Sequence, residues 1–426
     1  MPAARVAEYL LNTLFRFAPL TPGTVFCAVV IATVSVTGAN AQATRAAQIE
    51  QQRREKVAKL WPERESPMVE MVNGLVDRGW LEGATSGQGA NGWQAVLGGM
   101  RSGHGFTAGI GYRRTDLMRD ALGWRTTVRG TPQLAYMIDS RLDFQQLRSD
   151  RSELYFDMKY ENSPMMDFYG QGPDSSKSFR SSYRLEDVNL DLKGRFRVLG
   201  KFYLRGLVGG MFVNTGRGKR KGFPSTDELF PPEELPGIQD QTDFFKAGGG
   251  IQFDWRDNPR GPKYGGNYYA DLLHYSDTKL SKHSFTRLDM AVEQYVPYFN
   301  RSRVIALRVA AAMTFAQDGQ SVPFYLLPTL GGNEMLRGFA RYRFHDENYV
   351  IGVVEHRWHV FAGMDAAIFM EAGKVVPKIR FLNLSKLEYA GGIGLRFKIK
   401  ESVFMRIDGA VSREGLRVMW TFNNVF

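Results

Sequence analysis

The chain has 426 residues, of which 45 are glycines, 13% are aromatic and one is a cysteine. Its mean hydropathy of −0.30 excludes a helical membrane protein, but not a β-barrel, in which only every second strand residue meets lipid. The formal net charge of +11 suits nucleic acid or anionic lipid as a partner. Because the chain begins like an exported protein, lipid headgroups are favoured and nucleic acid is not expected.

Residues 1–41 are predicted to be a secretory signal peptide. Arg5 and Arg16 precede an uncharged stretch at 24–36, and Ala39-Asn40-Ala41 offers small residues for cleavage. The apolar run is short for a bilayer span of about 20 residues. An anchored helix is the alternative, because the segment ahead of the run is unusually long. Cys27 lies inside the signal, so the exported chain would have no thiol for disulfides or metals.

Residues 42–91 are predicted to form a periplasmic helix and a linker. The stretch at 43–61 is rich in Ala, Gln, Glu, Arg and Lys, which favour helices, and Pro62 should end the helix. The residues that follow finish in a Gly-, Ser- and Asn-rich run typical of a flexible connection. Two interpretations remain open for this segment: a plug in the lumen of a barrel, or a tether.

From Trp93 onward, apolar and polar residues alternate with period two, which predicts strands. Sixteen runs can be drawn, an even number, as in bacterial single-chain barrels. They are 93–99, 105–113, 122–130, 133–145, 152–162, 184–198, 202–214, 244–256, 266–276, 284–297, 302–316, 347–361, 363–373, 389–399, 402–412 and 415–426.

The last run shows why these strands should close into a transmembrane barrel. Five apolar residues share one of its faces: Leu416, Val418, Trp420, Phe422 and Phe426. A soluble protein rarely ends on such an edge, because an unpaired strand invites aggregation. Lipid would accept the apolar face, and charges such as Lys246 must then face inward, since a Lys or Arg toward lipid near midplane costs ~2–4 kcal/mol. The fold class is therefore all-β: a sixteen-stranded antiparallel transmembrane β-barrel over residues 92–426.

The connections between the strands support the same topology. The long ones, at 163–183, 215–243, 317–346 and 374–388, all follow odd-numbered strands, and those after even-numbered strands are short. Alternate connections lie on opposite rims, so every long loop emerges on one side. Long outer loops and short periplasmic turns are typical of outer-membrane barrels.

The connection between the eleventh and twelfth strands contains Gly331-Gly332-Asn333-Glu334-Met335-Leu336-Arg337-Gly338-Phe339. This segment resembles the signature loop of the bacterial surface antigen family, the BamA and TamA group in the outer-membrane assembly superfamily. That family has sixteen strands and carries Val or Ile before Arg-Gly-Phe or Arg-Gly-Tyr in the same loop. Three further segments, 168–172, 254–259 and 369–373, are similar to family motifs in the same order. The chain departs from the pattern at two positions. Leu336 stands where the family has Val or Ile, and Glu371 stands where the family has Asp.

The resemblance implies a site inside the barrel, because the family's loop folds into the lumen and its Arg meets the acid of strand thirteen. The period-two pattern also directs Glu371, Glu355 and Asp408 inward. Gly338 would allow close backbone approach and Phe339 would pack on the wall. An ordinary solvated charge is the alternative for Arg337. The expected site comprises Leu336, Arg337, Gly338, Phe339, Glu355, Phe369, Glu371, Gly373 and Asp408.

The same resemblance implies a function in membrane assembly. Family members insert or export polypeptides through a weak seam between the first and last strands, by β-augmentation and without a cofactor. Trp420, Phe422 and Phe426 resemble the terminal insertion signal of bacterial barrels. The family's assembly members carry POTRA domains, for which residues 42–91 are too few, so a periplasmic helper protein is expected beside the polypeptide clients. The alternative is a passive pore or a structural barrel.

No pattern in the chain predicts an enzyme, a metal site or a cofactor. His356 and His359, three apart on a strand, should point to opposite faces, and no Ser, His and acid arrangement typical of an outer-membrane lipase is recognisable. The basic loop 216–222 lacks the Lys-Ser/Thr and the helix of a phosphate-binding loop. It is interpreted either as a solvated loop or as a contact with outer-membrane lipid, lipopolysaccharide included.

Overall fold

The computed structural model describes residues 91–101, 105–147, 151–239, 241–361, 363–383, 385–399 and 401–422, together with Gln51 and Phe426. The expected signal peptide at 1–41 and, apart from Gln51, the expected helix and the linker up to residue 90 lie outside the described residues. Within the described part of the chain, no helix is both long and apolar enough to cross a membrane.

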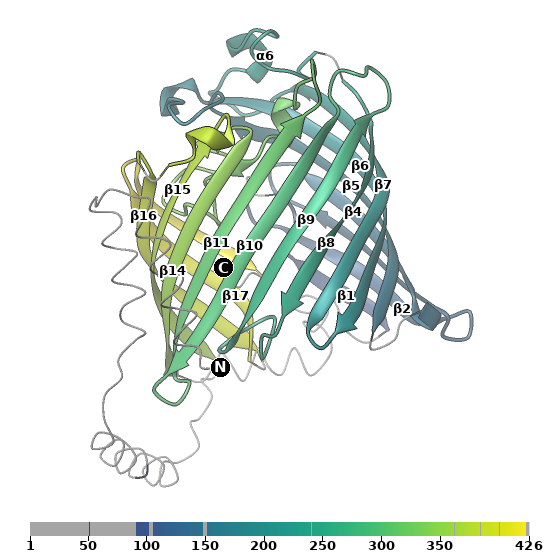
Figure 1. Cartoon of the computed structure of the whole chain (residues 1–426), viewed down its shortest axis with the longest axis vertical. Coiled ribbons are helices and arrows are strands. Elements are labelled where there is room, and N and C mark those ends of the chain that lie inside the picture. The colour runs from purple at the N-terminus through teal and green to yellow at the C-terminus, as the bar shows by residue number, and fades with distance from the viewer. Residues whose placement is uncertain are drawn as a thin grey trace. The chain divides into compact units, whose positions relative to one another are not determined.

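Sixteen strands form one antiparallel sheet that curls into a nearly closed barrel (Figure 1). Each strand pairs only with its neighbours in the sheet, so the prediction of a sixteen-stranded barrel is confirmed. The strands are β1 (Gly92–Leu97), β2 (Ala108–Leu117), β3 (Leu122–Gly130), β4 (Tyr136–Phe144), β5 (Ser152–Phe168), β6 (Ser181–Leu199), β7 (Phe202–Arg217), β8 (Phe244–Asp254), β9 (Gly265–Asp277), β10 (Phe285–Tyr298), β11 (Arg303–Ala316), β14 (Asn348–Phe361), β15 (Met364–Val376), β16 (Glu388–Ile399), β17 (Ser402–Ser412) and β18 (Gly415–Phe422).

The remaining elements lie in the connections. A second sheet of two residues per strand pairs β12 (Thr329–Leu330) with β13 (Phe344–His345). The short helix α6 (Thr226–Leu229) lies in the loop between β7 and β8, at the end of the barrel where the long loops gather (Figure 1). The described residues also include four 3-10 turns: Gln145–Leu147, Lys177–Phe179, Phe324–Leu326 and Ile379–Phe381.

The strands alternate between a lipid face and a lumen face as their sequences predict. On β8, Phe245 and Ile251 are each 49% exposed, whereas Lys246 between them is 4% exposed. On β16, Ile393 is 67% exposed and Arg396 is 1% exposed. Apolar side chains therefore face outward and charged side chains face the lumen, the arrangement that a bilayer requires.

Several strand boundaries differ from those predicted. β2 covers 108–117 rather than 105–113, and β8 ends at Asp254 rather than at residue 256. The largest difference is at the hairpin of β5 and β6, where the loop covers only residues 169–180 instead of the predicted 163–183. A register shift between Ser163 and Met166 accommodates Pro164, and the ladder then continues to Phe168. A bulge lets a proline sit within a paired strand, which period-two reading does not capture.

The end of the chain contradicts the sequence prediction. β18 ends at Phe422, and Phe426 does not lie on the lipid face. Its side chain is 4% exposed and belongs to an apolar cluster inside the barrel, with its ring 5.7 Å from that of Tyr295. The guanidinium of Arg357 lies 5.0 Å from the Phe426 ring. The terminal ring is therefore buried in an apolar cluster, and no period-two pattern could reveal that cluster.

Loops fill much of the lumen. The loop between β11 and β14, residues 317–347, is called the inner loop here. Its buried residues Leu336, Phe339 and Phe344 pack with Tyr295 and Ile351 of the wall. A second cluster nearer the outer rim joins outer-loop and wall residues, among them Phe168, Tyr183, Phe244, Phe285, Phe324 and Tyr325. These apolar contacts give the barrel an interior that is packed toward the outer rim.

The assigned faces predict the cost of a charge on the lipid side. Ile393→Arg, in the middle of β16, should lower the free energy of unfolding in bilayers by roughly 2–4 kcal/mol, because the guanidinium would face lipid. Gln252→Arg is the control, since Gln252 faces the lumen between exposed Ile251 and Phe253. Urea unfolding in lipid vesicles measures both. An equal loss at the two positions would contradict the assigned faces.

Candidate functional site

A tight turn in the inner loop aims Arg337 at the barrel wall. Leu336 has φ 50°, and the amide of Phe339 donates to the carbonyl of Leu336 at 2.9 Å. Both side chains are fully buried, and the ring of Phe339 lies 5.2 Å from that of Phe344. Leu336 and Phe339 anchor the turn on both sides of Arg337, and the guanidinium of Arg337 points toward the barrel wall.

Gly338 brings the turn against the wall. A Cβ built at this position would lie 2.7 Å from Cβ of Ser412 on β17, a distance that real side chains do not show. The hydroxyl of Ser412 donates to the carbonyl of Gly338 at 2.8 Å. The absence of a side chain is therefore what allows the loop backbone to reach β17.

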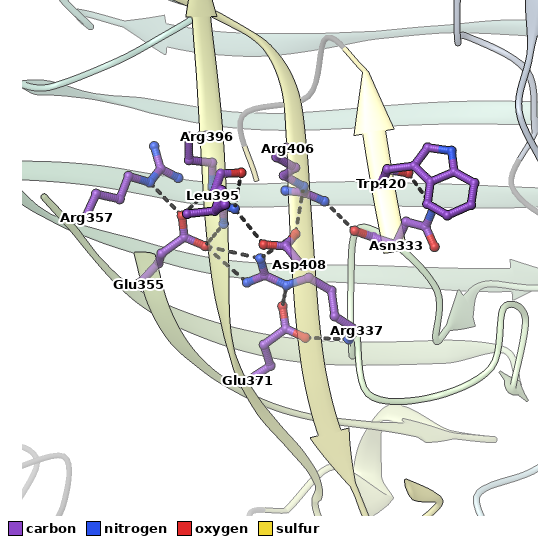
Figure 2. A network of polar contacts seen from close by, with 10 residues as sticks. All are labelled: Asn333, Arg337, Glu355, Arg357, Glu371, Leu395, Arg396, Arg406, Asp408 and Trp420. Carbon is purple, nitrogen blue, oxygen red and sulfur yellow. Dashed lines mark hydrogen bonds and ion pairs between the residues drawn. The ribbon is translucent and has the colours of Figure 1, made fainter. Parts of the chain in front are cut away.

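Arg337 is surrounded by carboxylates (Figure 2). Its Nε donates to Glu371 at 2.7 Å, and its backbone amide donates to the other oxygen of the same carboxylate at 2.6 Å. Nη1 and Nη2 both donate to Glu355 at 3.2 Å, and Nη1 also lies 3.4 Å from Asp408. The carbon of the guanidinium lies 3.4 Å from the centre of the Phe369 ring. One side chain thus joins three strands, β14, β15 and β17.

Three further arginines complete this group. Arg396 donates to Glu355 at 2.8 Å and to Asp408 at 2.5 Å, and Arg357 donates to Glu355 at 2.7 Å. Arg406 lies 3.1 Å from Asp408. We call the seven residues the charge cluster: Arg337, Arg357, Arg396, Arg406, Glu355, Glu371 and Asp408.

The charge cluster is buried and holds four guanidinium groups against three carboxylates. Burial disfavours the charge on Arg337, but Glu371, Glu355 and Asp408 outweigh burial and hold the pKa of its guanidinium above the ordinary value. In such a group each charge depends on its partners, and removing one partner of a buried pair typically costs ~3–5 kcal/mol. The charge cluster therefore acts as a single fastening between the inner loop and the wall.

A second anchor holds the far end of the inner loop. Arg343 donates to Glu414 at 2.6 Å and to the backbone and hydroxyl of Ser175 at 2.6 and 2.9 Å. The amide of Gly172 donates to the carbonyl of His345 at 2.8 Å. Burial, and then Arg343, lower the pKa of His345 to about 3, so this imidazole is neutral at neutral pH. The segment at 168–172 therefore serves to pair with the inner loop.

The inner loop also touches the last strand. The side-chain amide of Asn333 donates to the carbonyl of Trp420 at 3.3 Å, and Arg406 donates to the carbonyl of Asn333 (Figure 2). Trp420 is exposed on the lipid face, and Phe422 is half-buried with its ring 5.8 Å from that of Phe106. The position of the inner loop and that of β18 are thus connected through hydrogen bonds.

The segment at 254–259 builds the turn between β8 and β9. The carboxylate of Asp257 accepts from the amides of Lys263 and Tyr264 at 3.0 and 3.1 Å. The side chain of Asn258 donates to the carbonyl of Glu401 at 3.1 Å, in the turn between β16 and β17. The turn therefore reaches another inner turn, and its residues stabilise a shape rather than offer reactive groups.

The structure places the expected site residues on the inner loop and on β14, β15 and β17. The structure brings Arg337, Glu355, Glu371 and Asp408 into direct contact, with Phe369 beneath the guanidinium. Gly373 lies beside β14, where a Cβ would come 2.9 Å from the carbonyl of Val350. Sequence reasoning placed Arg396 on the inward face but did not select it, because no motif marks it. Arg343 and Asn333 were also missed as anchors, although both lie within or next to the signature loop. Among the described residues, no group of His, Cys, Asp and Glu could hold a metal ion.

This geometry can be compared with known proteins. The family model described as the Omp85 superfamily domain matches residues 143–399, more than half of the chain. The chain belongs to the Omp85 superfamily. This Omp85 barrel is accordingly a protein of the bacterial outer membrane, as the lipid-facing belt requires. A search of curated proteins found no match.

Solved structures share the fold of this Omp85 barrel at low sequence identity. BamA from Haemophilus ducreyi lacking POTRA domains 1–3 is 14% identical with a TM-score of 0.59, over 78% of this chain and 70% of that one. CdiB from Escherichia coli is 12% identical with a TM-score of 0.50, over 76% of this chain and 61% of that one. The barrel thus spans less than two thirds of the CdiB chain. These likenesses show the BamA type of fold and no more.

The contacts of Arg337 predict what its removal does. Arg337→Ala should leave three carboxylates with one partner fewer, at a cost of ~3–5 kcal/mol, and should release the inner loop. Limited proteolysis of the purified barrel should then cut within 317–347. Arg413→Ala is the control, because Arg413 pairs with Glu388 in an exposed position and its loss should cost little. An unchanged digestion pattern in Arg337→Ala would exclude the fastening role.

Proposed function

We propose that this Omp85 barrel inserts or exports polypeptides at the outer membrane through a seam formed by β1 and β18. The proposal rests on the ends of the sheet. In the sixteen-stranded sheet each strand is hydrogen-bonded to the next one. Within the described residues, β1 and β18 are the two end strands of this sheet. An unpaired strand edge is a template for another strand, so a client can add there by β-augmentation without a nucleotide or a cofactor.

The lengths of the strands support a weak seam. β1 has six residues and β18 has eight, whereas β5 and β6 have 17 and 19. The two ends come close together, because a Cβ at Gly98 would lie 3.0 Å from Cβ of Phe422. Short edges offer few backbone hydrogen bonds, so a seam between β1 and β18 can hold fewer of them than the long strand pairs in the wall.

The inner loop is proposed to set the state of the seam. Asn333 bonds the backbone of β18 at Trp420, and the charge cluster fixes the loop that carries Asn333. A passive pore, the second function considered, fits less well, because the inner loop and its apolar residues occupy the lumen. The proposed partners are polypeptide clients, a periplasmic helper protein and outer-membrane lipid near the loop at 216–222. In that loop Arg220 and Arg217 already pair with acidic residues, so lipid would contact Lys219 and Lys221. Lipopolysaccharide that co-purifies with the unaltered barrel and is lost when both lysines are replaced would support this contact.

A disulfide across the seam tests the function. The exported chain is expected to have no cysteine, so Gly98→Cys with Phe422→Cys creates one pair; the Cβ distance needs only a small adjustment toward the usual ~3.5–4.5 Å. Gly98 has φ 71°, so the new side chain costs ~1–2 kcal/mol, well below the stability of a barrel. The oxidised barrel should stop folding a client barrel in proteoliposomes, and reduction should restore folding.

The matched control joins strands that are already paired. Ile393→Cys with Gly409→Cys links directly opposite residues of β16 and β17, and its oxidation should leave client folding unchanged. Ion conductance is measured on the same samples. Client folding that persists through a closed seam would rule out the proposal. A large conductance without any client folding would favour the passive pore.

The C-terminal residue is proposed to serve two roles, an insertion signal before folding and an interior contact afterwards. Phe426→Ala should lower the amount of barrel that reaches the membrane, because the terminal aromatic residue is lost. Tyr295→Ala removes the ring that packs on Phe426 and leaves the terminus intact, so it should affect only protease resistance. Heat-modifiable barrel in outer-membrane fractions is the measurement. Equal membrane levels for Phe426→Ala and the unaltered chain would reject the signal.

A further inference from the structure

The connection from β1 to β2 leaves the wall directly after β1. Gly98 and Gly99 have φ 71° and 84°, in the left-handed region that favours glycine, so the strand ends here. Nη1 of Arg129, on β3, donates to the carbonyl of Gly98 at 3.3 Å. Residues 98–101 of this connection are called the β1 turn here, and Arg101 is the residue at its end.

Arg101 bridges two carboxylates of the lumen wall. Glu161 on β5 lies directly opposite Asp187 on β6. Both face the lumen, because exposed Met158 and Leu192 occupy the other face of the same two strands. The backbone amide of Arg101 donates to Glu161 at 2.8 Å, and its Nη1 donates to Asp187 at 2.5 Å. The β1 turn is thus fastened to strands that lie four and five places from β1 in the sheet.

The two carboxylates need positive partners. Like charges directly opposite each other on neighbouring strands are destabilising, and neither the Glu161 nor the Asp187 side chain is exposed to water. Lys159 lies 2.7 Å from Glu161, and Arg101 pairs with Asp187. Burial disfavours the charge on Arg101, but Asp187 and Glu161 outweigh burial and hold the pKa of its guanidinium above the ordinary value. Removing one partner from such a buried group strongly destabilises what remains, so Arg101 is held firmly in place.

The same connection also contacts β18. A Cβ at Gly98 would lie 3.0 Å from Cβ of Phe422, and the ring of Phe106 lies 5.8 Å from the Phe422 ring. Arg101 follows Gly98 by three residues. The β1 turn therefore touches the last strand at one end and is fastened to β5 and β6 at the other.

We propose that Arg101 is a positioning residue of the seam, which fixes the end of β1 against β18 by holding the β1 turn on β5 and β6. β1 pairs with β2 over only six residues, so a fastened end limits how far β1 can move. On the opposite side of the seam, the inner loop makes the corresponding contact with β18 through Asn333. The inference rests on the proposed function for the purpose of the seam, but the position of β1 can be measured without a client.

Disulfide trapping across the seam tests this role in the whole purified barrel. The seam pair is Gly98→Cys with Phe422→Cys, and the rate of its oxidation is measured, because the thiols meet only while β1 lies against β18. Arg101→Met keeps the length of the side chain and loses the charge, so it should slow trapping by roughly fivefold or more. Arg205→Met is the matched control. It removes another lumen arginine that joins two strands, by its ion pair with Asp271, and should leave the trapping rate unchanged.

Two further variants separate positioning from general stabilisation. Arg101→Lys keeps the charge and should restore most of the trapping rate. Asp187→Asn should slow trapping as Arg101→Met does, and the two changes together should slow it no further, because they remove the same interaction. Should Arg101→Met fail to fold, the comparison is made between Arg101→Lys and Asp187→Asn. An arginine that only stabilises the barrel would lower the unfolding temperature without changing the trapping rate, and that result would overturn the inference.

Client folding in proteoliposomes distinguishes this inference from the proposed function. Slower trapping in Arg101→Met, together with no client folding by the unaltered barrel, would support the fastening and reject the proposed function. Client folding by the unaltered barrel, together with equal trapping rates in Arg101→Met and the seam pair alone, would leave the proposed function standing and reject the fastening.

Discussion

The structure depends on the pairing of one buried arginine. Arg337 would be a costly charge inside the barrel, and it is tolerated only because Glu371, Glu355 and Asp408 come from three strands to meet it. The three carboxylates in turn need the positive charge of the Arg337 guanidinium. These contacts hold the inner loop inside the lumen, and they tie the wall from β14 to β17 together at the same point.

This fastening makes the barrel unequal around its circumference. The quarter from β14 to β17 carries the charge cluster and contacts the inner loop, and its strands are cross-connected from inside. On the other side of the seam, β1 has only six residues. β1 and β18, the two ends of the sheet, are also its two shortest strands. The hydrogen bond from Asn333 to Trp420 places the inner loop against β18, one of the two ends of the sheet.

Much of this architecture follows from local rules. Alternation of apolar and polar residues gave the sixteen strands and their faces, because a strand in a bilayer has one lipid side and one wet side. The same rule placed Glu355, Glu371 and Asp408 inward, and the resemblance to the surface antigen family paired Arg337 with Glu371. The rule did not distinguish Arg396 from other inward arginines, since only the register of β16 against its neighbours brings it between Glu355 and Asp408. It also placed Phe426 on the lipid face.

The sequence by itself determined the all-β class, the number of strands, the sorting of long and short connections and the choice of lipid-facing residues, because each depends on the period of the backbone. Only the tertiary structure decided which inward charges meet, where the terminal ring is buried, and that Arg101 reaches the carboxylates of β5 and β6. Those outcomes depend on register, on bulges such as the one at Pro164, and on loops that fold back into the lumen. These features bring together residues that lie far apart in the chain, and a local sequence pattern does not show which distant residues will meet.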